Sequence, residues 1–238
     1  MLLAFPIGLY TALRDPFIQT FVVRSAASYL SHQLNSTILI GCFYIDLDLS
    51  LEINDLTVYD QQNTILFQAD KVKVRPSANF LKSFSVAEVI LEKATVQIVR
   101  YENEDDLNMQ FILDYFKDSK ADSTIDLPAS SPSAFRMGHF KMIDGAFRYW
   151  DQQRDRPGNI GMDYAHLNIT DINLEFRSID IIGDSVSCIV EQLSAKDTCG
   201  VHLKNMQAKL FVSSNGVVAK SFILEANDSH IDTDLTFT

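Results

Sequence analysis

A strict alternation of apolar and polar residues at positions 45–53 is the feature that most constrains the fold. Successive side chains of a β-strand point to opposite faces, so a period of two is typical of a strand with one apolar and one solvated face. The segment therefore predicts one long amphipathic strand. Its apolar face would consist of Ile45, Leu47, Leu49, Leu51 and Ile53.

The same pattern continues along most of the chain. In residues 65–75, Val72 and Val74 alternate with basic side chains. Residues 86–91 and 95–101 indicate a hairpin that turns at Lys93 and its neighbours. A strand spacing of about 8–14 residues is typical of antiparallel all-β proteins. Further strands are expected at 56–59, 135–143, 146–151, 164–170, 172–182, 185–191, 200–203, 206–213, 217–226 and 230–237.

Two segments have a helical period instead. Pro16 is well placed to open an amphipathic helix over residues 16–34. Leu107, Phe111 and Tyr115 predict a second, short helix over residues 107–117. The expected fold is mostly antiparallel β, either a curved, taco-like groove or an open sandwich of repeated β-meander units, with these two helices.

The expected domain organisation follows from composition. Residues 118–134 are rich in Ser, Ala, Asp and Pro, which indicates a linker. It separates a helix and first β-unit at 16–117 from a second β-unit at 135–238. A weak internal repeat supports two copies of one unit, because residues 56–62 (LTVYDQQ) resemble residues 147–153 (FRYWDQQ).

Both ends of the chain suggest a fragment of a longer protein. Residues 1–13 carry no charge, but they are shorter than the ~20 apolar residues that a bilayer span needs. Residues 1–15 are therefore interpreted as a truncated membrane anchor, the alternative being an apolar arm that packs on the domain. At the other end, an alternating strand stops in mid-pattern.

Composition and motifs exclude several function classes. The chain has 20 Lys+Arg, 31 Asp+Glu and a net charge of −11, without a basic cluster, so nucleic acid is an unsuitable partner. It lacks a nucleophile elbow, a P-loop and a dinucleotide fingerprint. The acidic run 102–106 lacks the order of a calcium loop and predicts a solvated turn. We expect no enzymatic activity and no cofactor, and no metal site, since zinc spacing is absent around His32, His139, His166, His202 and His230.

The three cysteines leave two interpretations open. Cys188 and Cys199 could lie on neighbouring strands and form a disulfide in an oxidising compartment. The alternative is that both, together with Cys42, are buried free thiols.

The apolar faces of so many amphipathic strands must be covered by another apolar surface to be kept from water. In an ordinary β-sandwich the partner is a second sheet, and the core is sealed. In a curved sheet with an open apolar face, the partner can be a lipid. Periodicity alone does not choose between these two arrangements.

The order of the segments resembles a known family. After an arginine-Asp-Pro junction come FIQTFVVRSAASYLS, LTVYDQQNTILFQADKVKV, VAEVILEKATVQIVRYENEDDLNMQFI and later FRMGHFKMIDGAFRYWDQQ. This order is similar to the N-terminal region of the AsmA-like superfamily, in particular the TamB-like envelope proteins of Bacteroidota-type bacteria. The positions that match the recurring pattern of the family are Asp60, Leu66, Arg100 and Asn108.

The resemblance implies an inner-membrane anchor and a periplasmic β-groove that shields phospholipid on its way between the inner and outer membrane. Partners would be phospholipid, the inner membrane and an outer-membrane barrel protein of the assembly machinery. An alternative role is an assembly factor that pairs its strands with outer-membrane clients. The groove would be lined by Ile45, Leu47, Leu49, Leu51, Ile53, Val72 and Val74.

Overall fold

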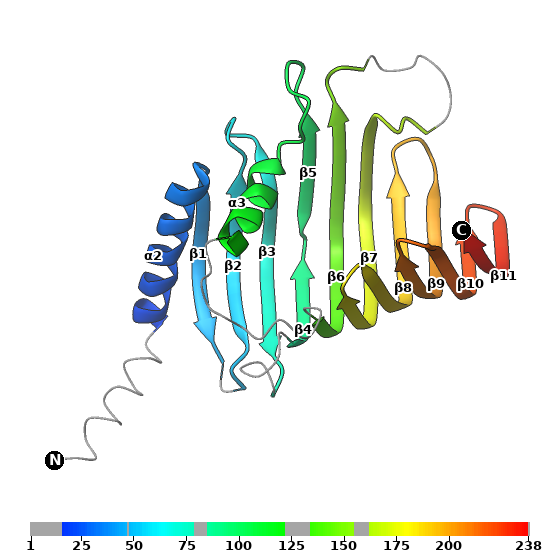
Figure 1. Cartoon of the computed structure of the whole chain (residues 1–238), viewed down its shortest axis with the longest axis horizontal. Coiled ribbons are helices and arrows are strands. Elements are labelled where there is room, and N and C mark those ends of the chain that lie inside the picture. The colour runs from blue at the N-terminus through cyan, green and yellow to red at the C-terminus, as the bar shows by residue number, and fades with distance from the viewer. Residues whose placement is uncertain (1–15, 47, 79–84, 122–133, 155–161, 238) are drawn as a thin grey trace.

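The computed structural model describes residues 16–46, 48–78, 85–121, 134–154 and 162–237. They form one 11-stranded sheet in the order β1-β2-β3-β4-β6-β7-β8-β9-β10-β11, while β5 pairs with β3 and β6 (Figure 1). The strands are β1 (Ile38–Ile45), β2 (Leu51–Tyr59), β3 (Ile65–Pro76), β4 (Ser85–Glu92), β5 (Thr95–Arg100), β6 (Ala134–Asp151), β7 (His166–Ile182), β8 (Ser185–Asp197), β9 (His202–Ser213), β10 (Gly216–Ala226) and β11 (Ser229–Phe237). The predicted mostly antiparallel β fold is confirmed at this level.

The predicted single strand over residues 45–53 is wrong, because the chain turns within it. The Asp46 N–H donates to the Ser50 carbonyl at 2.9 Å, which closes a hairpin between β1 and β2. Asp48 accepts hydrogen bonds from the backbone N–H and the hydroxyl of Ser50 at 3.1 and 2.6 Å. Such local bonds compete with an extended backbone, and alternation cannot reveal them. Leu49 lies in this turn with φ at 63° and is 65% exposed, and Leu47 lies outside the described residues.

The predicted hairpin around Lys93 is also wrong. β4 and β5 do not pair with each other; both pair with β6, and both are parallel to it. The Lys93 N–H donates to Ile143 O and the Ala146 N–H donates to Ala94 O, each at 2.8 Å. The chain therefore stays bonded to β6 while it passes from β4 to β5. This parallel junction joins the predicted first and second β-units into one sheet.

β6 and β7 each contain a β-bulge at a position where the sequence predicted that one strand ends and another begins. Asp144 in β6 and Asp171 in β7 have φ values of 55° and 51°, and the ladder register shifts beside each of them. The Asp144 N–H donates to Asn173 Oδ1 at 3.1 Å, which ties one bulge to the next strand. A bulge adds one residue and bends its strand, so each pair of predicted short strands is one long, bent strand.

The helix α2 (Pro16–Leu34) has the predicted bounds and lies along the β1 edge of the sheet (Figure 1). Its side chains bond to the outer backbone groups of β1. Arg24 donates to Gly41 O at 2.7 Å and to Ile40 O at 3.3 Å, and Ser31 Oγ accepts from the Ile38 N–H at 2.9 Å. The helix thus covers a strand edge that would otherwise be free to pair.

The second helix, α3 (Gln110–Ala121), contacts α2. It begins and ends a few residues later than predicted, so residues 118–121 of the predicted linker are helical. Residues 122–133 of that linker and the apolar segment 1–15 lie outside the described residues. Within the described ranges, neither helix has the length and apolar character that a bilayer crossing requires.

Candidate functional site

One face of the sheet carries two unbroken rows of apolar side chains. Residues opposite each other in a ladder point to the same side, so the register alone defines each row. We call the two rows together the apolar face. The first row consists of Ile45, Leu51, Val74, Val89, Phe140, Phe176, Val190 and Ala208, and the second of Phe43, Ile53, Val72, Leu91, Met142, Leu174 and Leu193.

The opposite side of the sheet, which we call the polar face, carries the side chains that alternate with the apolar ones along each strand. Its ladder runs through Glu52, Lys73, Ile90, Lys141, Glu175 and Gln192. Cross-strand ion pairs connect neighbouring strands, for example Arg75 with Glu88 at 3.4 Å and Lys71 with Glu92 at 3.5 Å. The sheet as a whole is therefore amphipathic from β1 to β8.

The apolar face is half-buried rather than sealed. Among its members only Phe43, Val190 and Ala208 are buried, at 7%, 2% and 4% exposure. Central residues such as Leu91 and Met142 keep intermediate exposure, and Ile45 is 41% exposed. A two-layer core would bury these aliphatic side chains almost completely. The part of the chain that the structure describes contains one sheet, so the open-sandwich form of the fold prediction is not found there.

Apolar pairing continues to the last strand. A further row crosses from β6 to β11 through Phe135, Ile181, Val186, Val212, Val217 and Phe237. Several of its side chains are well exposed, with Val212 at 39% and Phe237 at 62%. Exposed apolar side chains therefore occur in the last strands of the sheet as well.

The predicted lining residues separate into two groups. Ile45, Leu51 and Val74 lie in the first row of the apolar face, and Ile53 and Val72 lie in the second. Leu49 does not belong to it, because it lies in the β1–β2 turn. The members from β4 onward were missed. Each strand alternates visibly in the sequence, but alternation does not say which strands are neighbours.

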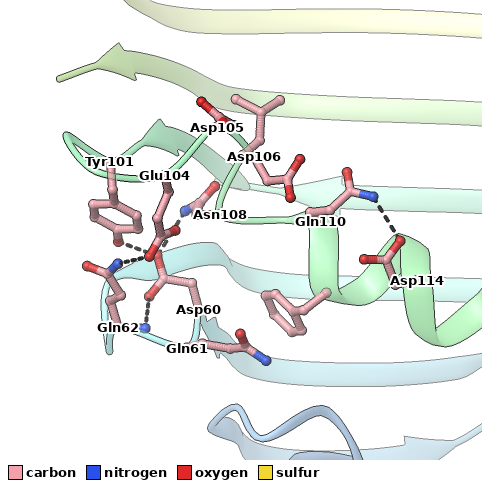
Figure 2. A pocket seen from close by; sticks show the side chains of 12 residues that line it. Asp60, Gln61, Gln62, Tyr101, Glu104, Asp105, Asp106, Asn108, Gln110 and Asp114 are labelled. Atoms are coloured by element: carbon pink, nitrogen blue, oxygen red, sulfur yellow. Dashed lines mark hydrogen bonds between the residues drawn. The ribbon is translucent and has the colours of Figure 1, made fainter. Parts of the chain in front are cut away.

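A buried polar cluster holds the end of β2 against β5 (Figure 2). Asp60 is 2% exposed. Its Oδ1 accepts from the backbone N–H groups of Gln62 and Thr64 at 2.9 and 2.8 Å. Its Oδ2 accepts from the Tyr101 hydroxyl at 2.6 Å and from Asn108 Nδ2 at 2.9 Å. All four bonds satisfy one buried carboxylate, as a buried charge requires.

Asn108 connects this cluster to β5. Its backbone N–H donates to Val99 O at 2.8 Å, and its side-chain Oδ1 accepts from the Val99 N–H at 3.0 Å. It thus takes the place of a neighbouring strand where β5 extends beyond its pairing with β3. Burial, with a smaller contribution from the bond to Asp60, raises the pKa of Tyr101 to about 12.

The pocket in Figure 2 lies beside this cluster and has a volume of about 460 Å³. Its wall includes Glu104, Asp105, Asp106 and Asp114. Glu104 accepts from Gln62 at 2.7 Å and Asp114 accepts from Gln110 at 2.9 Å, so these carboxylates bind side-chain amides of the chain itself. No His, Cys, Asp and Glu group among the described residues has the arrangement of a metal site.

The two segments of the internal repeat share a turn geometry. Asp151 accepts from the Gln153 N–H through Oδ1 at 3.1 Å, as Asp60 does from Gln62. Asp197 does the same with the Cys199 N–H at 2.8 Å, at a third strand end that the sequence comparison missed. The positions that carried the family resemblance are thus structural. Asp60, Leu66 and Asn108 are buried, and Arg100 lies 3.4 Å from the buried Asp151.

The possible disulfide between Cys188 and Cys199 is not formed, and all three cysteines are free, as the alternative interpretation expected. Cys188 pairs with Leu210 in the middle of β8, whereas Cys199 lies in the turn after the end of that strand. A strand rises about 3.3 Å per residue, so the two thiols are separated by about 30 Å, far beyond disulfide reach. Only the burial expected in that alternative is wrong, since Cys42 and Cys199 are exposed and Cys188 is half-buried.

Comparison with known proteins adds no relative. The chain matches no family model and no curated protein. A functional assignment therefore rests on the geometry of the sheet, and the resemblance to the AsmA-like superfamily stays a prediction from the sequence.

Proposed function

We propose that this chain is a segment of an AsmA-like, TamB-like envelope protein that shields phospholipid acyl chains on its apolar face. The protein would be anchored in the inner membrane and extend through the periplasm, and its sheet would curve into a groove for lipid transport to or from the outer membrane. The observation that carries the proposal is the apolar face itself. It crosses consecutive strands without a polar interruption, and no second sheet among the described residues seals it.

Physical chemistry supports a conduit on such a surface. Each CH₂ group of a lipid that leaves water gains about 0.8 kcal/mol, so an acyl chain on an apolar surface is strongly stabilised. Neighbouring strands are about 4.8 Å apart, and each contributes an aliphatic or aromatic side chain to at least one row. A lipid that moves across the sheet exchanges one such contact for the next. This role needs no reacting group, so the proposed protein is not an enzyme.

Photo-crosslinking from two adjacent positions tests this role. A photoreactive phenylalanine analogue replaces either Met142, on the apolar face, or Lys141, on the polar face of the same strand. The full chain is expressed in a bacterial envelope, illuminated, purified and analysed for phospholipid adducts. We expect an adduct from position 142 and at least tenfold less from position 141.

Two outcomes of this experiment would contradict the proposal. Equal adducts from positions 141 and 142 would mean non-specific contact with membrane. No adduct from position 142, in a chain that remains folded, would mean that the apolar face does not receive lipid.

Strand pairing with an outer-membrane client is a second candidate function. β11 pairs with β10 alone among the described strands, whereas α2 covers the edge of β1. Among the described strands, β11 therefore has the side at which a client strand could add. A photo-crosslinker at Thr233 would capture an outer-membrane barrel protein if this occurs, and the position 142 probe would remain without lipid if pairing is the sole role.

A further inference from the structure

A second pocket lies where β5 runs parallel to β6. It has a volume of about 200 Å³ and shares Tyr101 with the pocket in Figure 2. The parallel ladder pairs Gln97 with Arg148. Two residues further along, it pairs Val99 with Trp150, so these side chains point to one side of the sheet. We call this site the Trp150 pocket, and its lining includes Thr64, Gln97, Val99, Arg148, Trp150 and Gln152.

Arg148 has an exposed guanidinium whose charge no carboxylate balances. Among the arginines of the described strands, it alone has no acidic side chain within ion-pair distance. The other four are paired, Arg75 with Glu88, Arg100 with Asp151, Arg136 with Asp180 and Arg177 with Glu191. None of the residues that line the Trp150 pocket is acidic, although the chain carries 31 Asp+Glu. A guanidinium presents donors that match a carboxylate or a phosphate, so the pocket offers an anion a partner.

Two amide side chains add further hydrogen-bonding groups to the Trp150 pocket. The side chain of Gln97 has no hydrogen-bond partner among the described residues, and its backbone carbonyl accepts from Asn108 Nδ2 at 3.4 Å. Gln152 Oε1 accepts from the Glu102 N–H at 3.2 Å, while its NH₂ group has no acceptor among the described residues. Donors that lack acceptors favour a ligand with several oxygen atoms.

Trp150 gives the pocket a flat apolar wall. Its side chain is 38% exposed, whereas Val99, its partner in the ladder, is 3% exposed. The His166 ring contacts the indole edge-on, with 4.5 Å between the ring centroids and 66° between the planes, and so fixes its orientation. The C–H groups on the face of a sugar ring suit the negative π-face of an indole. A wall that is fixed before binding loses little freedom when a ligand arrives.

We propose that the Trp150 pocket binds a small sugar that carries a carboxylate or a phosphate group. Arg148 binds the anionic group, the amides of Gln97 and Gln152 bind hydroxyls, and the sugar ring packs against Trp150. The volume is below the about 300–1,000 Å³ that is usual for drug-sized ligands, which limits the ligand to about one ring. None of these residues belongs to the apolar face, so failure of this site would leave the proposed lipid role untouched.

Intrinsic fluorescence of the full chain tests the site, because Trp150 is the single tryptophan of the sequence. Glucuronate and glucose 6-phosphate are the two probes, and they distinguish a carboxylate from a phosphate. We expect at least one of them to change the emission in a saturable way, with a Kd of about 1 mM or below. Glucose and inorganic phosphate each lack one part of the proposed ligand and should bind at least tenfold more weakly.

A pair of arginine variants assigns the anionic group to its partner. Arg148→Gln should weaken binding of the effective probe at least tenfold, because charged hydrogen bonds are lost. The control Arg136→Gln changes an arginine of the same strand outside the pocket and should keep the wild-type affinity. A wild type that responds to neither probe would overturn the proposal. Equal affinity in the wild type and Arg148→Gln would do the same, as would binding of glucose or inorganic phosphate as tight as that of the acidic sugar.

Discussion

A single buried carboxylate, Asp60, holds together three segments of the chain. It accepts hydrogen bonds from its own turn, from Tyr101 and from Asn108. Hydrogen bonds to a charged group contribute about 1.5–3 kcal/mol each when a partner is removed. Asp60→Ala should therefore lower the free energy of unfolding by about 3 kcal/mol or more, measured by chemical denaturation. Asp105→Ala removes an exposed carboxylate from the same pocket and should change it by less than about 0.5 kcal/mol. Equal effects would contradict a structural role for Asp60.

Tyr101 gives this cluster a pH dependence in the alkaline range. Its pKa is raised to about 12, first by burial and then by the bond to Asp60. Between about pH 10 and pH 12 the unfolded chain loses the phenol proton and the folded chain keeps it, so stability should decline over that range. Ultraviolet absorbance during alkaline titration should show one tyrosine that ionises late, and Tyr101→Phe should remove it. A titration of Tyr101 near pH 10 would contradict the burial argument.

At the scale of elements, α2 protects the edge of β1 through side chains rather than through a backbone ladder. Thr20 Oγ1 lies 3.4 Å from both the N–H and the carbonyl of Phe43. Thr20→Val keeps the shape of the side chain and removes these contacts. We expect the Phe43 amide to exchange with solvent at least tenfold faster in hydrogen-exchange NMR, since it loses its acceptor. The control Ser28→Ala, at an exposed position of the same helix, should leave that rate unchanged. Unchanged exchange in Thr20→Val would mean that the edge is protected in another way.

The sequence was most informative where a pattern was long and local. The helix over residues 16–34 has its predicted bounds, because an opening proline and helical spacing act within the segment. The alternation at 45–53 was misleading, since short side-chain bonds of Asp48 and Ser50 turn the chain without breaking the alternation. The path from β4 to β5 also escaped prediction. A turn-like sequence at Lys93 is compatible with a hairpin and also with a bulge between two successive strands. Pairing of β4 and β5 with the distant β6 determines which of the two forms.

At the scale of the whole molecule, the apolar face depends on strand neighbours that no local pattern reveals. Val72 and Leu91 share the second row because β3 pairs with β4, and Met142 joins them through the parallel pairing of β4 with β6. Predicting a few lining residues from the sequence was therefore feasible, whereas predicting their continuity across both halves was not. Continuity is what a lipid conduit needs, because a gap in the row would expose an acyl chain to water.

A charge placed in the middle of this face tests whether it is open. Leu91 lies on the apolar face and Ile90, its neighbour, lies on the polar face between Lys73 and Lys141. Because Leu91 is only half-buried, the carboxylate of Leu91→Asp can reach water, and the cost should be about 1–3 kcal/mol, near the low end for a buried polar group. The chain should remain folded, and its lipid adduct from a photo-crosslinker at position 142 should fall at least tenfold. Ile90→Asp places the same charge beside two lysines and should keep the adduct. Global unfolding of Leu91→Asp at 25 °C would mean that the face is sealed, and an undiminished adduct in a folded variant would mean that lipid does not use this row.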